Sequence, residues 1–278
     1  AKARREVQER LKLVDVVIEL LDARLPLSSR NPMMHDIVKD KPRLVLLNKS
    51  DLADQVINRE WLHYFANRNV QAALIDARSG TGIDRLPGQA AKLMHKKWQA
   101  LAQKGVRNKA VRCLIVGIPN VGKSSLINRL AGRSAAKTGD RPGVTKAQQW
   151  IKVGTQMQLL DTPGILWPKF DDPLIGQRLA ASGAIKDDIL PVEEVAVYLL
   201  RYLSERYPEA LQTRYQLEPL PKDDVQLLET IGEKRGCIVS GGIVDLEKAA
   251  EVLLRDLRSG KLGRISLEFP EDWSGKSE

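Results

Sequence analysis

A short glycine-rich segment carries a lysine and two hydroxyl side chains at a spacing that suits phosphate chemistry. Residues 117–125 read Gly-Ile-Pro-Asn-Val-Gly-Lys-Ser-Ser and match the phosphate-loop pattern G-x-x-x-x-G-K-[ST], between an apolar run and a helical pattern. Backbone N–H groups of such a loop, and of the helix that follows, bind phosphate oxygens. Lys123 is expected to bridge the β- and γ-phosphates and Ser124 to bind Mg²⁺. The predicted phosphate-binding residues are Pro119, Asn120, Val121, Gly122, Lys123, Ser124 and Ser125.

A second turn suited to Mg²⁺ follows another apolar run. Asp161-Thr-Pro-Gly164 comes directly after Met-Gln-Leu-Leu, which predicts a metal-side carboxylate at a strand end. The N–H of Gly164 would contact the γ-phosphate and lose that contact on hydrolysis. In the polar loop upstream, Thr145 is the favoured second Mg²⁺ hydroxyl, with Thr138 as the alternative. The residues expected to take part directly in catalysis are Lys123, Thr145 and Gly164.

A base-reading motif, Asn48-Lys-Ser-Asp51, follows the apolar run Arg-Leu-Val-Leu-Leu. The Asp51 carboxylate can accept two hydrogen bonds from the N1–H and N2–H₂ edge of guanine, an arrangement that adenine lacks. The aliphatic stem of Lys49 can cover the base, and Asn48 can tie neighbouring loops together. At the next strand end, the N–H groups of Asp76, Ala77 and Arg78 could meet guanine O6. The motifs together predict GTP and GDP as ligands.

These motifs together resemble those of the translation-factor-class P-loop GTPases, in most of which the phosphate loop comes first and the base reader last. Here the base reader, residues 48–51, precedes the phosphate loop, residues 117–124. The same sheet can still form if the chain is circularly permuted, so that the N- and C-terminal ends of the usual order are joined by a linker. Lys104–Lys109 is the plausible linker. The new ends then fall after Asp161–Gly164 and before Asp22. The C-terminal part of the chain therefore follows the γ-phosphate-sensing loop directly, and we expect nucleotide state to move it against its target.

Length and composition predict a globular protein of one large or two modest domains. The chain has 278 residues, of which 43% are hydrophobic. No apolar run approaches the roughly 20 residues that a membrane span needs, so no membrane partner is expected. Cys113 and Cys237 form neither a disulfide framework nor a metal cluster, which fits a reducing, cytoplasmic location. The chain does not begin with Met, so the native protein is expected to extend upstream.

The charge distribution predicts a polyanionic partner. The net charge is +9, and residues 85–139 hold twelve Lys or Arg but no Asp or Glu. A solvated helix face usually mixes both signs, whereas a long stretch without acids favours nucleic acid. Charge alone does not separate RNA from DNA.

Alternating strand and helix patterns predict an α/β domain with a mostly parallel sheet flanked by helices. Strands are expected at residues 14–21, 43–47, 72–75, 111–116, 148–153 and 157–160. Helices are expected at residues 2–12, 59–67, 83–103, 123–130, 192–205, 222–234 and 246–258. The expected domains are a GTPase domain over residues 1–185 and a small all-helical, RNA-binding domain over residues 186–278.

These motifs together resemble the translation-factor-class P-loop GTPases, and longer segments resemble the circularly permuted ribosome biogenesis GTPase A (RbgA/YlqF) family. The segments that carry the resemblance are residues 22–31, 117–125, 137–143, 161–169 and 231–237. The resemblance covers essentially the whole chain. It implies a GTPase that acts late in large ribosomal subunit assembly and whose helical C-terminal domain binds RNA. The implied partners are the large subunit and its rRNA, with no DNA, and the protein is expected to be a monomer.

Two departures from the family pattern bear on the site. The usual Ala or Ser-Ala-Lys signature reads Asp76-Ala77-Arg78, which leaves the role of residue 76 open. Family members also carry an upstream segment ending in Gly-His-Met, whose histidine is a candidate catalytic group. The chain starts just beyond where that segment would end.

The residue after the Asp-x-x-Gly turn bears on how hydrolysis is activated. Many GTPases place a water-orienting Gln there, but this chain has Ile165, so the isolated protein is expected to be slow. The missing group could come from the upstream histidine, from rRNA or from K⁺, for which Asn120 is the candidate ligand. Two other functions remain open: a GTPase of another RNA process such as tRNA modification, and a non-catalytic protein that uses GTP to bind RNA.

Overall fold

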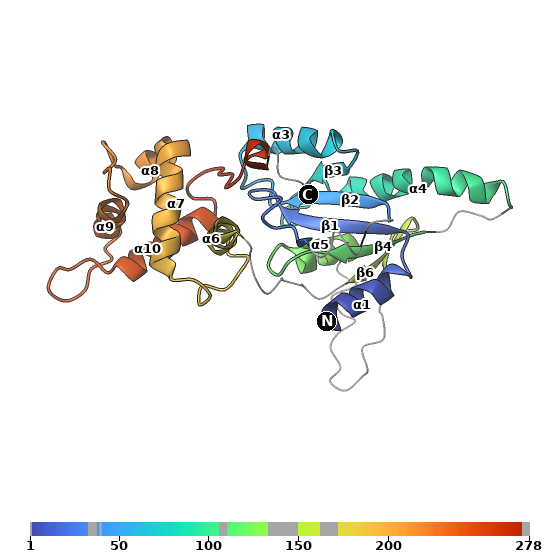
Figure 1. Cartoon of the computed structure of the whole chain (residues 1–278), viewed down its shortest axis with the longest axis horizontal. Coiled ribbons are helices and arrows are strands. Elements are labelled where there is room, and N and C mark those ends of the chain that lie inside the picture. The colour runs from blue at the N-terminus through green and yellow to red at the C-terminus, as the bar shows by residue number, and fades with distance from the viewer. Residues whose placement is uncertain are drawn as a thin grey trace. The chain divides into compact units, whose positions relative to one another are not determined.

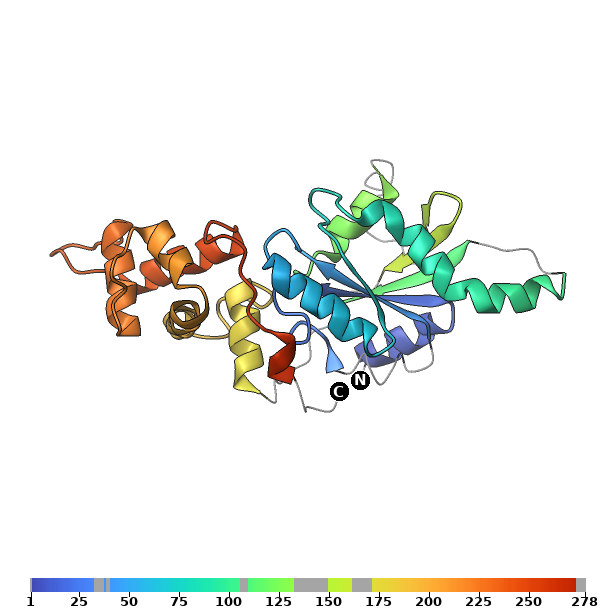
Figure 2. The same cartoon turned by 90° about the horizontal axis from the view of Figure 1, so that it is seen from above.

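The computed structural model divides into two compact units, each described separately (Figures 1 and 2). It describes residues 2–32, 38, 41–105, 110–132, 150–161 and 172–273. The first unit takes in residues 1–51, 55–168 and 268–278, and the second takes in residues 52–54 and 169–267. The boundary expected after residue 185 falls within the second unit. Helix α6 (Pro173–Ser182) belongs there because it packs against α7 (Val192–Arg206) and α10 (Leu246–Arg258).

The first unit is built on a six-stranded sheet with the order β3-β2-β1-β4-β6-β5. The strands are β1 (Val16–Asp22), β2 (Arg43–Asn48), β3 (Gln71–Leu74), β4 (Val111–Val116), β5 (Trp150–Val153) and β6 (Met157–Asp161). Every neighbouring pair is parallel except β5 and β6, which are antiparallel. The predicted α/β class with a mostly parallel sheet is confirmed, and β5 and β6 pair as the expected hairpin.

The apolar character of the central strands explains how deeply the sheet is buried. Every residue of β1 is buried, which is typical of a parallel strand covered on both faces. Val17, Leu114 and Leu160 lie in register on three adjacent strands and pack with Val7 and Leu11 of α1 (Lys2–Leu11). Hydrophobic burial therefore sets the register of β1, β4 and β6.

Helices from the intervening segments cover this sheet (Figure 1). They are α3 (Gln55–Ala66), α4 (Leu86–Ala102) and α5 (Lys123–Ala131). Two 3₁₀ turns also belong to this unit, one at Ile83–Arg85 before α4 and one at Pro270–Trp273. The expected helix at residue 59 begins earlier, at Gln55. Ile57 and Asn58 are buried, and Asn58 Nδ2 donates to the Ser50 carbonyl at 3.1 Å, so tertiary contacts extend the helix beyond its local pattern.

The second unit is all-helical in its described residues, with α8 (Pro208–Tyr215) and α9 (Asp224–Lys234) beside α6, α7 and α10. Aspartates cap three of these helices: Asp172, Asp223 and Asp245 each accept a backbone N–H of the first turn. Helices α6 and α8 were not expected from the sequence. Both are short and begin at a proline, so packing against longer helices defines them more than any local periodicity.

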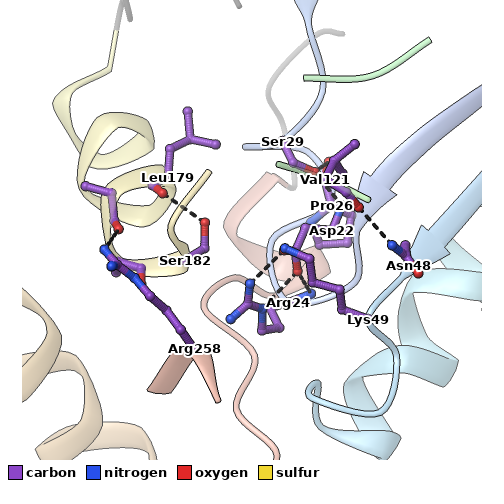
Figure 3. A network of polar contacts seen from close by, with 12 residues as sticks. Asp22, Arg24, Pro26, Ser29, Asn48, Lys49, Val121, Leu179, Ser182 and Arg258 are labelled. Carbon is purple, nitrogen blue, oxygen red and sulfur yellow. Dashed lines mark hydrogen bonds and ion pairs between the residues drawn. The ribbon is translucent and has the colours of Figure 1, made fainter. Parts of the chain in front are cut away.

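The α6 C-terminus is held by an arginine from α10. Figure 3 shows Arg258 reaching the end of α6, where it donates to the carbonyls of Ala180 at 2.8 Å and Ala181 at 3.2 Å. Arg258 also pairs with Asp187. A cation that binds the last carbonyls of a helix is favourable both as a hydrogen-bond donor and because its charge opposes the negative end of the helix dipole.

Among the described residues, no helix is long and apolar enough to cross a membrane.

A buried carboxylate joins α8 to α10 within the helical unit. Asp256 accepts two hydrogen bonds from Arg214, at 2.8 and 3.0 Å, and one from the Tyr215 hydroxyl at 3.2 Å. Burial raises the pKa of the Asp256 carboxyl, but the hydrogen bonds and charge of Arg214 outweigh it and hold the pKa below its usual range. The charged form of Asp256 therefore stabilises the folded unit.

Replacing Asp256 by Asn is expected to destabilise the helical unit by about 2 kcal/mol, because it removes the charge from a buried hydrogen-bonded pair. Urea unfolding followed by far-UV circular dichroism measures the change. The folded-state pKa lies below the unfolded value, so the carboxylate contributes stability above the unfolded pKa and loses it as pH falls through the folded pKa. Wild type and variant should therefore converge in acid. The matched control is Asp188→Asn at an exposed position, and equal losses in both variants would contradict the assignment.

Candidate functional site

The motif residues gather at one edge of the sheet because their strands are parallel. The carboxyl ends of β1, β2, β3 and β4 lie at the same edge, and Asp22 pairs in register with Asn48. Ligands of open parallel sheets bind outside the carboxyl ends of the strands. The base-reading and phosphate-loop segments, far apart along the chain, are thus brought to one place.

The phosphate loop has the local geometry that an anion requires. It leaves β4 after Val116 and enters α5 at Lys123. Asn120 and Gly122 have positive φ angles of 57° and 105°, left-handed conformations of the kind that turn successive N–H groups toward an anion. Helix α5 starts at a glycine cap without a side-chain hydrogen bond, so its first-turn N–H groups suit a phosphate.

The side-chain amide of Asn48 connects three loops. Its Nδ2 donates to the Val121 carbonyl in the phosphate loop at 2.8 Å, and its Oδ1 accepts the Ala77 N–H at 2.9 Å. The contact is close: a Cβ on Gly122 would lie 2.3 Å from Asn48 Nδ2. Gly122 is therefore required both by its φ angle and by the approach of Asn48.

The Asp76 carboxylate turns back onto its own loop. It accepts the Arg78 N–H at 2.8 Å, while the Asp76 N–H donates to the Thr81 carbonyl at 3.0 Å. Burial raises the pKa of Asp76, but hydrogen bonds from Ser79 and Arg78 outweigh it and lower the pKa. This aspartate turn explains how the loop tolerates a residue outside the usual signature. The N–H groups of Asp76, Ala77 and Arg78 all have partners within the protein, so a contact to guanine O6 must share or replace one of these bonds.

Lys49 is held by a buried carboxylate from the neighbouring strand end (Figure 3). Its Nζ lies 2.9 Å from Asp22 Oδ2, and the same carboxylate binds Arg24 through Nε and Nη2 at 3.0 and 2.8 Å. Burial raises the pKa of Asp22, but the charges of Arg24 and Lys49 and their hydrogen bonds outweigh it and hold the pKa well below its usual range. Lys49 adopts a positive φ of 60°, an uncommon conformation that this ion pair helps to retain.

The segment that carries Asp51 is fixed from both sides while its carboxylate stays exposed. Ser50 donates to the Ile75 carbonyl through its N–H at 3.2 Å and its hydroxyl at 2.9 Å. Burial lowers the pKa of Arg24, but the charges of Asp22 and Asp51 outweigh it and raise the pKa. Asp51 is thus an accessible acceptor on a rigid turn, which suits a planar donor edge such as that of guanine.

Comparison with known proteins identifies a family with this site. A family model described as "50S ribosome-binding GTPase" matches residues 112–235. Ribosome biogenesis GTPase A of Bacillus cereus is 55% identical over 278 residues, which cover 100% of this chain and 94% of the relative. The Thermotoga maritima protein of the same name is 31% identical over 271 residues, 98% of this chain and 92% of the relative. The chain belongs to the ribosome biogenesis GTPase A family.

A solved structure of the family agrees with this membership. GNP-bound YlqF from T. maritima is 26% identical, with a TM-score of 0.66, and the match covers 98% of this chain and 99% of that one. A GDP-bound YlqF structure from the same organism also has a TM-score of 0.66. The protein is therefore a GTP hydrolase of ribosome biogenesis, and its site takes guanine nucleotides, as the motifs predicted.

Some predicted residues lie outside the described part of this family member. Thr138, Thr145, Gly164 and Ile165 are among them, and of Asp161 only the backbone is described, paired in register with Ile115. The hydroxyl groups of Ser124 and Ser125 stand exposed in the first turn of α5. The described residues contain no group of three His, Cys, Asp or Glu side chains able to hold a metal ion by themselves.

Asp22 and Arg24 are site residues that motif reading missed. The sequence marked Asp22-Ala23-Arg24 as the polar end of a buried strand and as part of the family resemblance, but gave these residues no role in the site. A usable signal existed, because Asp22 directly follows the expected strand at residues 14–21 and Asn48 directly follows the next expected strand, at residues 43–47. In a parallel sheet such ends meet, so the carboxylate of one can be expected near the lysine of the other.

Replacing Gly122 by Ala is expected to weaken GDP binding about tenfold or more, because the new Cβ displaces Asn48 or the loop N–H groups and adds left-handed strain of order 1–3 kcal/mol. Titration with a fluorescent GDP analogue measures the affinity. Gly105→Ala is the matched control, since Gly105 has a positive φ of 76° but nothing within 4 Å of its added Cβ. Equal GDP affinity in the two variants would refute the steric argument.

Proposed function

We propose that this protein acts in late assembly of the large ribosomal subunit, binding the subunit and its rRNA and hydrolysing GTP when bound there. The observation that carries the proposal is the joined site: Asn48 links the phosphate loop to the base-reading loops in a chain whose family model is described as 50S ribosome-binding. The GTPase unit, residues 1–51, 55–168 and 268–278, supplies the switch, and the helical unit, residues 52–54 and 169–267, supplies the RNA contact. Assembly of this kind places the protein in the cytoplasm as a monomer.

The proposed nucleotide contacts follow from the site's charges and geometry. Asp51 accepts the guanine edge, Lys49 covers the base with its stem, and Lys123 neutralises the β- and γ-phosphates. Lys123 Nζ already lies 3.4 Å from the Gly117 carbonyl, across the phosphate loop. The remaining contacts are assigned to Pro119, Asn120, Val121, Ser125, Asp76, Ala77, Arg78 and Gly164.

We assign Mg²⁺ to Ser124 and Thr145, with Asp161 on the same side. The exposed hydroxyl of Ser124 at the start of α5 supports this assignment, and Mg²⁺, when bound, would stabilise charge on the transferred phosphate. Lys123, Thr145 and Gly164 are the residues that meet the γ-phosphate. Ile165 can neither donate nor accept a hydrogen bond, so activation of water depends on a group from elsewhere.

A potassium ion is our candidate for part of that activation, with Asn120 as its ligand. Asn120 is exposed and adopts a left-handed φ of 57° within the phosphate loop. An amide oxygen is a suitable ligand for a hard cation. A cation at this place would add positive charge where the γ-phosphate develops negative charge.

The helical unit offers exposed basic groups for an RNA backbone. Two arginines of this unit have internal roles: Arg258 caps α6, and the Arg235 guanidinium lies 5.1 Å from the Tyr215 ring centroid. Exposed basic residues of this unit include Lys234, Arg255, Lys261 and Arg264. A cavity of about 700 Å³ near Lys261 is lined by Glu209, Arg214, Gln216 and Gly260 among others, and it is large enough for a phosphate group.

Replacing Asp51 by Asn is expected to reverse base selectivity. The amide can donate to the xanthine O2 but cannot accept two guanine donors, so GDP affinity should fall by ~1.5–3 kcal/mol for each lost charged hydrogen bond. Binding of GDP and of xanthosine diphosphate is measured side by side. Guanine affinity that stays unchanged in Asp51→Asn would remove Asp51 from the base site.

The decisive experiment for the function is GTP hydrolysis with and without purified large ribosomal subunits, in K⁺ and in Na⁺. We expect slow turnover by the free protein and strong stimulation by large subunits, approaching the roughly 10³-fold or more that a supplied catalytic group can provide. The rate should be higher in K⁺. Stimulation by tRNA instead would favour a tRNA-processing GTPase, and no turnover with any RNA would favour a non-catalytic RNA-binding protein. Equal rates in Na⁺ and K⁺ would remove Asn120 as a cation ligand.

A further inference from the structure

The loop that follows β1 is buried throughout although it is neither helix nor strand. Asp22, the last residue of β1, is buried, and so is every residue of the loop from 23 to 31; Asp22 and this loop are together called the 22–31 loop. Loops normally run over the surface, because a buried loop must find partners for all of its backbone N–H and C=O groups. The side chains that satisfy this loop therefore decide whether it can hold the conformation that presents Asp22.

Some of the hydrogen-bond partners for these buried backbone groups come from the loop's own side chains. The Asp22 N–H donates to Ser29 Oγ at 2.9 Å, and the Ser29 hydroxyl donates to the Pro26 carbonyl at 3.0 Å. The Arg24 N–H donates to Asp22 Oδ1 at 3.1 Å. These bonds close the loop onto the Asp22 backbone and side chain.

The rest comes from one carboxylate at the far end of the chain. Glu268 is fully buried, with 0% of its surface exposed. Its Oε1 accepts the N–H of Leu27, both carboxylate oxygens lie 3.2 Å from the Ser28 N, and Oε2 accepts the Ser28 hydroxyl at 2.5 Å. Glu268 is the first residue of the C-terminal segment that belongs to the GTPase unit.

Glu268 is itself held in place by α3. The indole Nε1 of Trp61 donates to the Glu268 carbonyl at 3.4 Å, and Trp61 is fully buried. A buried carboxylate that accepts several hydrogen bonds is costly to move, because each displaced bond leaves a polar group without solvent. The Glu268 carboxylate is therefore a fixed point for the 22–31 loop.

The loop transmits this fixed position to the base-reading motif. From Ser28 the next residue, Ser29, holds the Asp22 backbone, and the Asp22 carboxylate pairs with Lys49 Nζ at 2.9 Å. Lys49 stands beside Asn48, at the end of β2, where the phosphate loop and the Asp76 loop meet. Every contact along this path lies within the GTPase unit.

We propose that Glu268 is a positioning residue for guanine recognition, which orients Lys49 through the buried 22–31 loop and Asp22. The proposal rests on the proposed contact between Lys49 and the base. Its consequence is that the C-terminal segment, which returns after the helical unit, is part of the nucleotide-binding machinery of the GTPase unit.

The test is a double-mutant cycle on the full chain, with GDP affinity as the readout. Glu268→Gln keeps the size of the side chain but removes the charge and one acceptor. Lys49→Met keeps an apolar stem over the base but removes the ammonium that Asp22 holds. Glu271→Gln, at an exposed position in the same segment, is the matched control. The urea unfolding midpoint of each variant is measured in parallel, and affinities are taken where all variants are folded.

We expect Glu268→Gln to weaken GDP binding about 3- to 10-fold and Glu271→Gln to leave GDP affinity unchanged. In the Lys49→Met background, Glu268→Gln should cause little further loss of GDP affinity, because the effects of coupled residues are non-additive. Ser28→Ala, which removes one bond to Glu268, should weaken GDP in the same direction by a smaller factor. A lower unfolding midpoint with unchanged GDP affinity would overturn the proposal, and so would a full additional loss in the Lys49→Met background. If Lys49→Met by itself leaves GDP affinity unchanged, it is the base contact of Lys49 that fails, and the inference about Glu268 falls with it.

Discussion

The hydrogen bonds of one side-chain amide hold the nucleotide site together. Asn48 donates a hydrogen bond to the phosphate loop and accepts one from the loop after β3. It therefore joins distant parts of the chain, since Asn48 and Val121 are 73 residues apart. An amide suits this role because it is donor and acceptor at once, and burial prevents water from replacing either partner. The glycine at position 122 follows from the same contact, since any Cβ there would meet the amide nitrogen.

A parallel sheet makes this arrangement independent of chain order. Strands β2 and β4 carry the base-reading and phosphate-binding segments, and they lie on either side of β1 with all three parallel. Their carboxyl ends meet at one edge whichever strand comes first along the chain. Circular permutation therefore leaves the chemistry of the site intact and changes only which segments enter and leave the GTPase unit.

Placing β1 between these strands creates a second requirement. Asp22, at the end of β1, must stay in contact with Lys49 while the loop that follows it remains buried. The backbone groups of this loop therefore need hydrogen-bond partners from elsewhere in the chain. Ser29 supplies one, and Glu268 supplies others from the C-terminal segment. Buried polar groups of this kind contribute to specificity because each is satisfied only in one arrangement.

The sequence alone determined the chemistry and most of the secondary structure, because both are encoded in short continuous stretches of residues. Examples are the phosphate loop at 117–125, the base reader at 48–51, and the buried strands β1, β2 and β4. The family and its GTPase activity followed from them, whereas the roles of Thr145 and Gly164 stay predictions. Only the tertiary structure decided that Asp22 and Arg24 join Lys49, that Asp76 closes its own loop, that α6 and α8 form, and that Glu268 binds the 22–31 loop. The reason is physical: hydrogen bonds between residues 240 apart, such as Ser28 and Glu268, depend on how the chain packs and leave no periodicity or spacing in the sequence.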